Sequence, residues 1–267
     1  MISYNEKLLA AFIIPSLLFM AARCDGSGGK EGNEVYDIGT KAGIEGYISD
    51  HWQEYGYREK PNKYLALSFD DGPCPSSNAG GTAALLETLK SAKVKATFFV
   101  IGQNVRNNSA AAQAIFDAGH ELGNHSNGYD SLGGSAPESI SENLDATSAE
   151  IKRISGKDPV LFRAPNLNHG ANLSQVCAAK GMALIDGSTH NDWPGNSTSI
   201  KNSVLANPYD GCIIILHENN TSQGNTMAVL PDIISGLREK GFWIMTVSEL
   251  AIVKGKTLQA GSRYSSL

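Results

Sequence analysis

Six polar side chains that can bind a metal ion or transfer a proton lie at, or just after, the ends of apolar runs in this sequence. They are Asp70, Asp71, His125, Arg163, Asp192 and His217. In parallel α/β folds, the carboxyl ends of the strands form the edge that hosts the active site. We therefore expect these residues, which are far apart in the sequence, to meet in one site.

The stretch "SFDDGP" (68–73) places Asp70 and Asp71 side by side before a Gly-Pro turn. Two carboxylates at such short range repel each other unless one is protonated or a cation neutralises the pair. A metal ion bound by one carboxylate removes this conflict and leaves the other as a general base. The alternative is an ordinary turn whose carboxylates cap a helix, and the stretch alone favours neither interpretation.

Two histidines add to this candidate chemistry. His217 ends the run "CIIILH", and it is a candidate general acid because the pKa of histidine lies near neutrality. His125 lies in "GHELGNHSNGYDSL", a corner rich in glycine and asparagine that is typical of a metal-binding imidazole. Each histidine alone is explained as a polar loop residue, and only the carboxylates at the same predicted edge favour a catalytic role.

Arg163 and Asp192 are candidates for orienting these groups. Arg163, in "FRAP", can pair with a carboxylate and fix its direction, or it can form an ordinary surface ion pair. Asp192, in "NDWPG", can orient His217, and the adjacent Trp193 can wall an apolar pocket. The alternative for this segment is a capped turn with a core tryptophan.

Short apolar runs alternate with helical segments from Tyr64 onward. The runs expected to form strands cover 64–69, 95–102, 121–125, 160–165, 182–188, 212–217 and 242–247, and helices are expected within 81–94, 107–120, 136–156 and 227–241. Alternation of strands and helices indicates an α/β fold with a parallel sheet or a barrel. Seven strands in one domain favour the barrel.

The composition favours an uncharged ligand. The chain has 267 residues, of which 41% are hydrophobic and 18% charged, which is enough for one sizeable core, and its net charge is -5. This balance gives no electrostatic footprint for a nucleic acid or an anionic membrane. We expect a monomer that binds a carbohydrate, a peptide or a small molecule, and no nucleic acid.

Residues 1–24 have the pattern of a secretory signal, in which Lys7 precedes an apolar run that is short for a membrane span and contains Pro15. An N-terminal membrane anchor is the alternative, and Cys24 raises that of a cell-surface lipoprotein. Residues 25–60 are expected to form a linker and a short appendage whose aromatic residues pack on the main body rather than bind sugar. The catalytic domain is then expected over 61–255, with a C-terminal tail over 256–267.

Three further cysteines, Cys74, Cys177 and Cys212, allow one disulfide in an exported protein. The remaining cysteine would stay free or pair with Cys24, and the sequence does not fix the pairing. No Cys-x-x-Cys spacing occurs, so a zinc knuckle is not expected.

The ordered set "SFDDGP", "GNHSNGY", "FRAPN", "NDW" and "ILH" resembles the five successive motifs of the polysaccharide deacetylase (NodB-homology) family, carbohydrate esterase family four. The resemblance covers residues 61–253. It implies a distorted, incomplete (β/α) barrel. It also implies a secreted hydrolase that removes acetyl groups from a polysaccharide or oligosaccharide with one divalent metal ion, Co²⁺ or Zn²⁺.

The resemblance implies catalytic roles by position. Asp70 matches the catalytic base, and Arg163 matches the arginine that pairs with this base. His217 matches the general acid, and Asp192 matches the aspartate that tunes it.

The same resemblance implies binding roles. Asp71 and His125 match two metal ligands. Ile215 and Trp193 match positions that line the pocket for the acetyl methyl group. The backbone N–H of Asn166 is expected to stabilise the oxyanion.

Two positions depart from the family pattern. Tyr129 stands where the family usually has a second histidine ligand, four residues after His125, and Asn166 replaces a common aromatic residue after Pro165. A neutral phenol is a poor ligand beside an imidazole, so we expect water to complete the metal site and Tyr129 to line the substrate pocket. His190 and His169 are alternative sources of a further ligand, and His120 is expected to be structural.

The departures are shared with family members that resemble acetylxylan esterases, which have "PPNL"- and "NDW"-type motifs where this chain has "APNL" and "HNDW". They favour removal of O-acetyl groups from xylan. The first alternative is an N-deacetylase acting on chitin or peptidoglycan. The second is a catalytically weak carbohydrate-binding protein that kept the barrel, although such a protein has no need for a base and an acid.

Overall fold

The structure, a computed structural model, describes residues 36–77, 81–129, 131–190, 192, 195–218 and 223–267. The predicted signal (1–24), including Cys24, and the predicted pocket residue Trp193 lie outside these residues. Within them, no helix has the length and the apolar character needed to cross a membrane.

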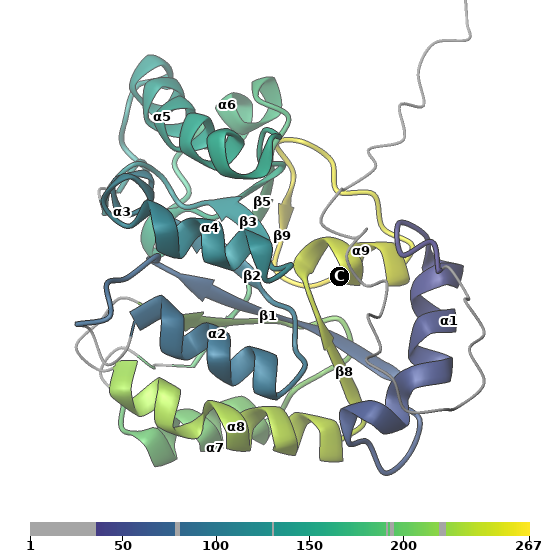
Figure 1. The fold of residues 1–267 in the computed structure, drawn as a ribbon. Coiled ribbons are helices and arrows are strands. Elements are labelled where there is room, and N and C mark those ends of the chain that lie inside the picture. The colour runs from purple at the N-terminus through teal and green to yellow at the C-terminus, as the bar shows by residue number, and fades with distance from the viewer. Residues whose placement is uncertain (1–35, 78–80, 130, 191, 193–194, 219–222) are drawn as a thin grey trace, which may run out of the picture.

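A curled sheet of parallel strands lies at the centre of the molecule (Figure 1). Its strand order is β6-β7-β1-β2-β3-β4-β5-β9, and β8 pairs with β1. The strands are β1 (Lys63–Asp70), β2 (Thr97–Val100), β3 (Glu121–Asn124), β4 (Leu161–Phe162), β5 (Ala183–Ile185), β6 (Ser188–Thr189), β7 (Ile213–His217), β8 (Phe242–Met245) and β9 (Arg263–Tyr264). The sheet ends at β6 and β9, which confirms the expected incomplete barrel.

All seven apolar runs form strands, and the structure adds β6 and β9. Each of these two additional strands is two residues long. The strand β4 is equally short, but it lies in an apolar run, whereas Ser188–Thr189 and Arg263–Tyr264 form no apolar run that would mark a strand in the sequence. The strand β9 lies in the segment 256–267 that we expected to be a tail. It pairs with β5, where Leu184 N–H donates to Ser262 O (2.9 Å) and Asp186 N–H donates to Tyr264 O (2.8 Å).

Helices follow most strands and flank the sheet (Figure 1). They are α1 (Lys41–His51), α2 (Gly81–Ser91), α3 (Gly102–Asn107), α4 (Ser109–Asp117), α5 (Pro137–Ser155), α6 (Leu173–Ala179), α7 (Ser197–Ala206), α8 (Gln223–Glu239) and α9 (Val247–Val253), with 3₁₀ turns η2 (Trp52–Tyr55) and η3 (Pro165–Leu167). The longest, α5, begins at Pro137, whose fixed φ suits a first helical turn. It ends where Gly156 adopts a left-handed conformation (φ 75°).

The two faces of β1 have different chemistry. Leu65, Leu67 and Phe69 belong to a core cluster that also contains side chains of α2, α4 and α8. Because successive strand residues point to opposite faces, Ser68 and Asp70 share the other face, which is the inner one. Both are buried. The same strand therefore supplies the core on one side and two polar groups on the other.

The segment before β1 packs on the barrel through aromatic side chains. The Tyr57 ring stacks on Trp243 with ring centroids 5.3 Å apart, and its hydroxyl donates to Phe242 O (2.8 Å). Ile44 and Ile48 of α1 are buried in the same cluster as Leu250 of α9. These aromatic residues make packing contacts with β8.

The disulfide that the sequence allowed among Cys74, Cys177 and Cys212 is not formed, and all three side chains are buried. Cys74 follows the carboxyl end of β1, whereas Cys212 precedes the amino end of β7. Because β1 and β7 are parallel neighbours, these two residues lie at opposite ends of the sheet. Cys177 belongs to α6 and to a separate core cluster. The three thiols are therefore too dispersed to pair.

Candidate active site

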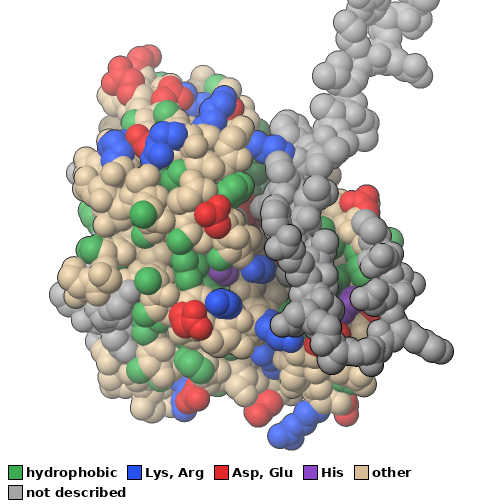
Figure 2. All heavy atoms as spheres, viewed as in Figure 1, with side chains coloured by type: hydrophobic (Ala, Val, Ile, Leu, Met, Phe, Trp, Pro, Cys, Tyr) green, Lys and Arg blue, Asp and Glu red, His purple; other side chains and the backbone are tan. Residues whose placement is uncertain are grey.

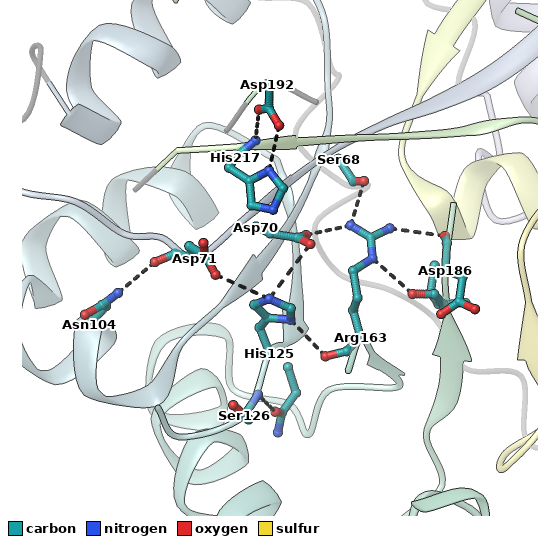
Figure 3. A network of polar contacts seen from close by, with 12 residues as sticks. Ser68, Asp70, Asp71, Asn104, His125, Ser126, Arg163, Asp186, Asp192 and His217 are labelled. Carbon is teal, nitrogen blue, oxygen red and sulfur yellow. Dashed lines mark hydrogen bonds and ion pairs between the residues drawn. The ribbon is translucent and has the colours of Figure 1, made fainter. Parts of the chain in front are cut away.

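The six predicted polar residues meet at the carboxyl edge of the sheet (Figure 3). Asp70 ends β1 and pairs in register with His217, which ends β7. His125 directly follows β3, and Arg163 directly follows β4. Parallel pairing of β1, β2, β3 and β4 brings these strand ends side by side. The fold thus confirms that residues separated by up to about half the chain lie together.

Asp70 is held by Arg163, and both side chains are buried. Arg163 Nη1 donates to Asp70 Oδ1 (2.6 Å) and to Ser68 Oγ (2.8 Å), while Nε donates to Ile185 O (3.0 Å). Burial alone would raise the pKa of Asp70, but the charges of Arg163, His125 and His217 outweigh it and lower the pKa below the ordinary value. Asp70 is therefore ionised near neutral pH, as a general base must be.

His217 is held by Asp192 on the opposite side of the pocket. Its Nδ1 lies 2.8 Å from Asp192 Oδ1, and its backbone N–H donates to Asp192 Oδ2 (2.7 Å). Burial alone would lower the pKa of His217, but the hydrogen bond to Asp192 and the charge of Asp70 raise it to about 9. His217 is therefore protonated near neutral pH, and its Nδ1–H points to Asp192.

His125 faces both carboxylates of the Asp-Asp pair. Its Nδ1 lies 2.8 Å from Arg163 O, which only accepts hydrogen bonds, so Nδ1 carries a proton. Its Nε2 lies 3.4 Å from Asp71 Oδ1 and 3.8 Å from Asp70 Oδ2. Burial opposes the charged imidazole, but the two carboxylates raise the pKa of His125 above its ordinary value.

A pocket with a volume of about 470 Å³ is lined by Asp70, Asp71, His125 and His217. Its wall also contains Tyr129, Asn166 and Ile215, which were predicted, and Ala164, Pro165, Leu167 and Thr189, which were not. Asn166 and Leu167 both have positive φ values, 55° and 52°, in the turn that forms one side of the pocket. Non-glycine residues rarely adopt this conformation, and such residues are concentrated at functional sites.

Comparisons with known proteins place this pocket in a family. Residues 57–185 match the family described as polysaccharide deacetylase. A peptidoglycan-N-acetylglucosamine deacetylase of Bacillus cereus is 34% identical over 200 residues, which cover 72% of this chain and 91% of that protein. The chain belongs to the polysaccharide deacetylase family.

Other members point to different substrates. A bifunctional xylanase/deacetylase of Pseudobutyrivibrio xylanivorans is 37% identical over 215 residues, which cover 79% of this chain but only 34% of that protein. A family 4 acetyl xylan esterase from Clostridium thermocellum, solved with a cobalt ion, has a TM-score of 0.71 and 32% identity, and the match covers 77% of this chain and 99% of the esterase. As a member of this family of carbohydrate esterases and deacetylases, the chain is a hydrolase.

Tyr129, at the position where the sequence resemblance led us to expect a second histidine ligand, has a side chain that is half exposed. Asn104 Nδ2 donates to Asp71 O (2.7 Å) and to Tyr129 Oη (3.2 Å), so the phenol is tethered to the backbone of the Asp-Asp turn. Burial raises the pKa of Tyr129 above that of an ordinary tyrosine. The phenol therefore stays neutral, which makes it a poor metal ligand.

The side chains of Asp71 and His125 fit a divalent cation. Nε2 of a neutral His125 presents a lone pair, because Nδ1 carries the proton, and this lone pair faces carboxylate oxygens of Asp71 and Asp70. Such a group of lone pairs is favourable only around a proton or a cation. No group of three or more His, Cys, Asp or Glu side chains arranged for a metal ion is found in the part of the chain that the structure describes. Two protein ligands plus water remain the arrangement that these residues support.

The other three histidines that the sequence analysis considered, His190, His169 and His120, make their contacts outside the pocket. His190 Nδ1 lies 3.0 Å from Ser203 Oγ, and His169 Nε2 lies 2.8 Å from Asp186 Oδ1. Neither lines the pocket. Buried His120 accepts a hydrogen bond from Ala96 N–H (3.1 Å) and is structural, as expected.

Sequence reasoning missed several residues that hold the site. Ser68 and Asp186 both accept from Arg163, the latter through its backbone carbonyl (3.3 Å). Asn104 tethers Tyr129, and Glu218, which follows His217, is buried against the Asp-Asp turn. Ser68 and Glu218 stand within or next to the recognised motifs, and that proximity was the available signal. Asp186 also follows an apolar run, at the end of β5, and this signal was overlooked, whereas Asn104 gave none, because only the fold brings it to the site.

Proposed function

We propose that this protein is a metal-dependent carbohydrate esterase that removes O-acetyl groups from xylan. The observation that carries the reaction type is the opposite shift of two pKa values in one pocket. The pKa of Asp70 is lowered and that of His217 is raised to about 9, so one side chain is a ready base and the other a ready acid at neutral pH. Hydrolysis of an acyl group needs both.

The residues act in a defined order in this proposal. Asp70, oriented by Arg163, accepts a proton from water as the water attacks the acetyl carbonyl carbon. Nε2–H of His217, oriented by Asp192, then protonates the departing sugar oxygen, which releases acetate and a free hydroxyl group. A divalent ion held by Asp71 and His125, with Co²⁺ or Zn²⁺ as candidates, would supply Lewis acidity and lower the pKa of water.

Binding groups line the same pocket. The backbone N–H of Asn166 is proposed to stabilise the oxyanion, and the buried side chain of Ile215 is proposed to contact the acetyl methyl group. Trp193 is proposed to complete this apolar contact, and Tyr129 to contact the sugar.

Two arguments support xylan as the substrate. The relatives include a xylanase/deacetylase and an acetyl xylan esterase, although the first is much longer than this chain. An alkoxide also leaves more readily than an amine anion, so an ester needs less activation than an amide. A metal site with two protein ligands and Tyr129 in place of a third therefore suits an O-acetyl ester.

Deacetylation of N-acetylglucosamine in peptidoglycan or chitin is the second candidate. It is favoured by the Bacillus cereus relative, of which this chain covers 91%. The deciding experiment measures acetate release from acetylated xylan, N-acetyl chitooligosaccharides and peptidoglycan side by side, with the metal-free protein and with added Co²⁺ or Zn²⁺. Faster release from chitooligosaccharide or peptidoglycan than from xylan would overturn the xylan proposal. Acetate release from none of them would favour a carbohydrate-binding protein.

We further propose that the protein is secreted as a monomer after removal of residues 1–24. The support is the signal pattern and the absence of a nucleic-acid footprint from a net charge of -5. N-terminal sequencing of the protein recovered from culture medium tests the cleavage. Retention of the intact N-terminus in the membrane fraction would indicate an anchor instead.

A further inference from the structure

Glu218 directly follows the proposed acid His217, and its side chain is only 4% exposed. Burial raises its pKa to about 8. Its Oε1 is buried and has no hydrogen-bond partner among the described residues. A buried oxygen without a hydrogen-bond partner destabilises the folded chain, so stability alone does not explain a carboxyl group here.

The carboxyl group lies directly on the Asp-Asp-Gly-Pro turn. A Cβ atom added to Gly72 would lie 1.2 Å from Glu218 Oε1 and 2.1 Å from Cδ. Gly72 is therefore required because the carboxyl group occupies the space that any other side chain would need. The preceding residue, Asp71, has a positive φ of 74°. A non-glycine residue keeps this conformation only where the surrounding structure enforces it.

Hydrogen bonds fix Glu218 to both sides of this turn. Its Oε2 accepts from Thr82 Oγ1 (3.0 Å), which in turn accepts from Cys74 N–H (2.8 Å). Its backbone N–H donates to Asp70 O (3.0 Å), and its backbone carbonyl accepts from Cys74 Sγ (2.5 Å). Glu218 therefore contacts the residue before Asp71 and the residues after it.

We propose that Glu218 is a positioning residue for the metal ligand Asp71. The carboxyl group packs on Gly72 and, through Thr82, holds Cys74, so that the turn keeps the Asp71 carboxylate opposite His125 Nε2. The inference rests on the proposed metal site of Asp71 and His125, and it extends that site to a residue that binds neither metal nor substrate.

The test measures Co²⁺ affinity of the metal-free protein by calorimetry, so the readout is independent of catalysis. Glu218→Ala and Glu218→Asp, which withdraw the carboxyl group from Gly72, are expected to weaken Co²⁺ binding by about 10–100-fold. Glu218→Gln keeps the shape and an acceptor for Thr82, and it is expected to bind Co²⁺ nearly as the parent does. If Glu218→Ala does not fold, the Co²⁺ affinity of Glu218→Asp alone tests the proposal.

Glu121→Ala is the matched control, because Glu121 is a partly buried carboxylate at the amino end of β3, bonded to Thr97 and Ser248. It is expected to lose stability without losing Co²⁺ affinity. Parent-like affinity in both Glu218→Ala and Glu218→Asp would overturn the positioning role. His125→Ala distinguishes failure of the proposed metal site from failure of the proposed role of Glu218. If His125→Ala also binds Co²⁺ like the parent, the metal site itself is wrong. If His125→Ala loses Co²⁺ binding while the Glu218 variants keep it, only the role of Glu218 is refuted.

Discussion

Asp70 and His217 lie in the same pocket, but their neighbours shift their pKa values in opposite directions. Arg163 stabilises the ionised form of Asp70, and Asp192 stabilises the protonated form of His217. Both supporting groups come from other strand ends, so the assignment of base and acid follows from the fold. At pH 7 each reacting group is therefore in the protonation state that its step requires.

Replacement of Asp192 tests this electrostatic arrangement. Asp192→Asn removes the main interaction that raises the pKa of His217, so the pKa is expected to fall from about 9 toward the ordinary value near 6.5. NMR titration of the metal-free protein measures the midpoint, and the alkaline limb of kcat should move to lower pH with it. An unchanged His217 midpoint in Asp192→Asn would contradict the assignment.

The same shift makes a prediction for stability. The pKa of His217 is raised on folding, so its contribution is fully present below about pH 6.5 and is lost as the pH rises through about 9. The free energy of unfolding of the parent protein should therefore exceed that of Asp192→Asn at pH 6, and the difference should shrink by pH 10. Denaturant unfolding at the two pH values measures it. A difference that grows with pH would contradict the sign.

Tyr129 offers a gain-of-ligand test. Tyr129→His places an imidazole four residues after His125, where it can act as a further ligand of the proposed metal site, so the Kd for Co²⁺ is expected to fall. Tyr129→Phe removes only the hydroxyl group and should leave the Kd close to that of the parent. Titration of the metal-free proteins with Co²⁺ measures both. A large loss of affinity in Tyr129→Phe would show that the phenol is itself a ligand.

At the scale of elements, the carboxyl ends of the strands position the side chains of the candidate site. Asp70, His125, Arg163 and His217 stand at or next to the carboxyl end of a parallel strand, and Arg163 gains two further contacts from Ile185, the last residue of β5, and from Asp186, which follows it. The strand β9 supports this edge, because Arg263 Nε lies 3.2 Å from Asp186 Oδ2. The C-terminal segment is thus connected through Asp186 to the arginine that holds the base.

Removal of β9 is expected to lower the thermal stability of the protein more than removal of its ion pair to Asp186 does. The Arg263 side chain is 57% exposed, so Arg263→Ala should destabilise by at most about 1 kcal/mol, or about 2–4 °C in Tm. A chain ending after Gly255 also loses the hydrogen bonds of β9 to β5 and should show a larger fall in Tm. Thermal unfolding measures both, and an equal Tm for the two variants would contradict a role for the strand.

The sequence predicted elements well where a repeated pattern exists. The strand β7 is recognisable as a continuous apolar run and the helix α5 by its helical spacing, whereas the two residues of β6 or of β9 show neither. The helix predicted within 107–120 is confirmed as α4, whereas α3 was not predicted, and the chain leaves the helical conformation between the two at Asn108 (φ -129°, ψ 48°). That break depends on tertiary contacts, including the bond from Asn108 Nδ2 to Pro73 O (3.2 Å).

The residues of the candidate site were likewise predictable where a pattern in the sequence marks them. Asp70, Arg163 and His217 stand at the ends of recognisable apolar runs, and the ordered motifs identified their neighbours. The support from Asn104 was not predictable, because its contacts join segments whose proximity only the folded chain creates. Asp186, at the end of the apolar run of β5, carried the same signal as the other site residues and could have been found. The sequence also left open whether Cys74, Cys177 and Cys212 form a disulfide, since a cysteine count does not give distances.

At the scale of the whole molecule, an open parallel barrel carries one edge where the proposed base, the proposed acid and the two proposed metal ligands converge. Figure 2 shows acidic and basic side chains interspersed over the face in view, in keeping with a net charge of -5 and an uncharged polysaccharide substrate. The chemistry therefore depends on the pocket rather than on a general electrostatic attraction to the substrate.

The most direct test of this account is the rate of acetate release from acetylated xylan by the parent protein and by Asp70→Asn. Both are assayed after removal of metal and again after return of Co²⁺, with Asp158→Asn, which changes an exposed aspartate, as the control. The parent and the control should regain activity with Co²⁺, whereas Asp70→Asn should stay about 10²–10⁴-fold slower while still binding the ion. Undiminished acetate release by Asp70→Asn would contradict the assigned base and with it the proposed mechanism.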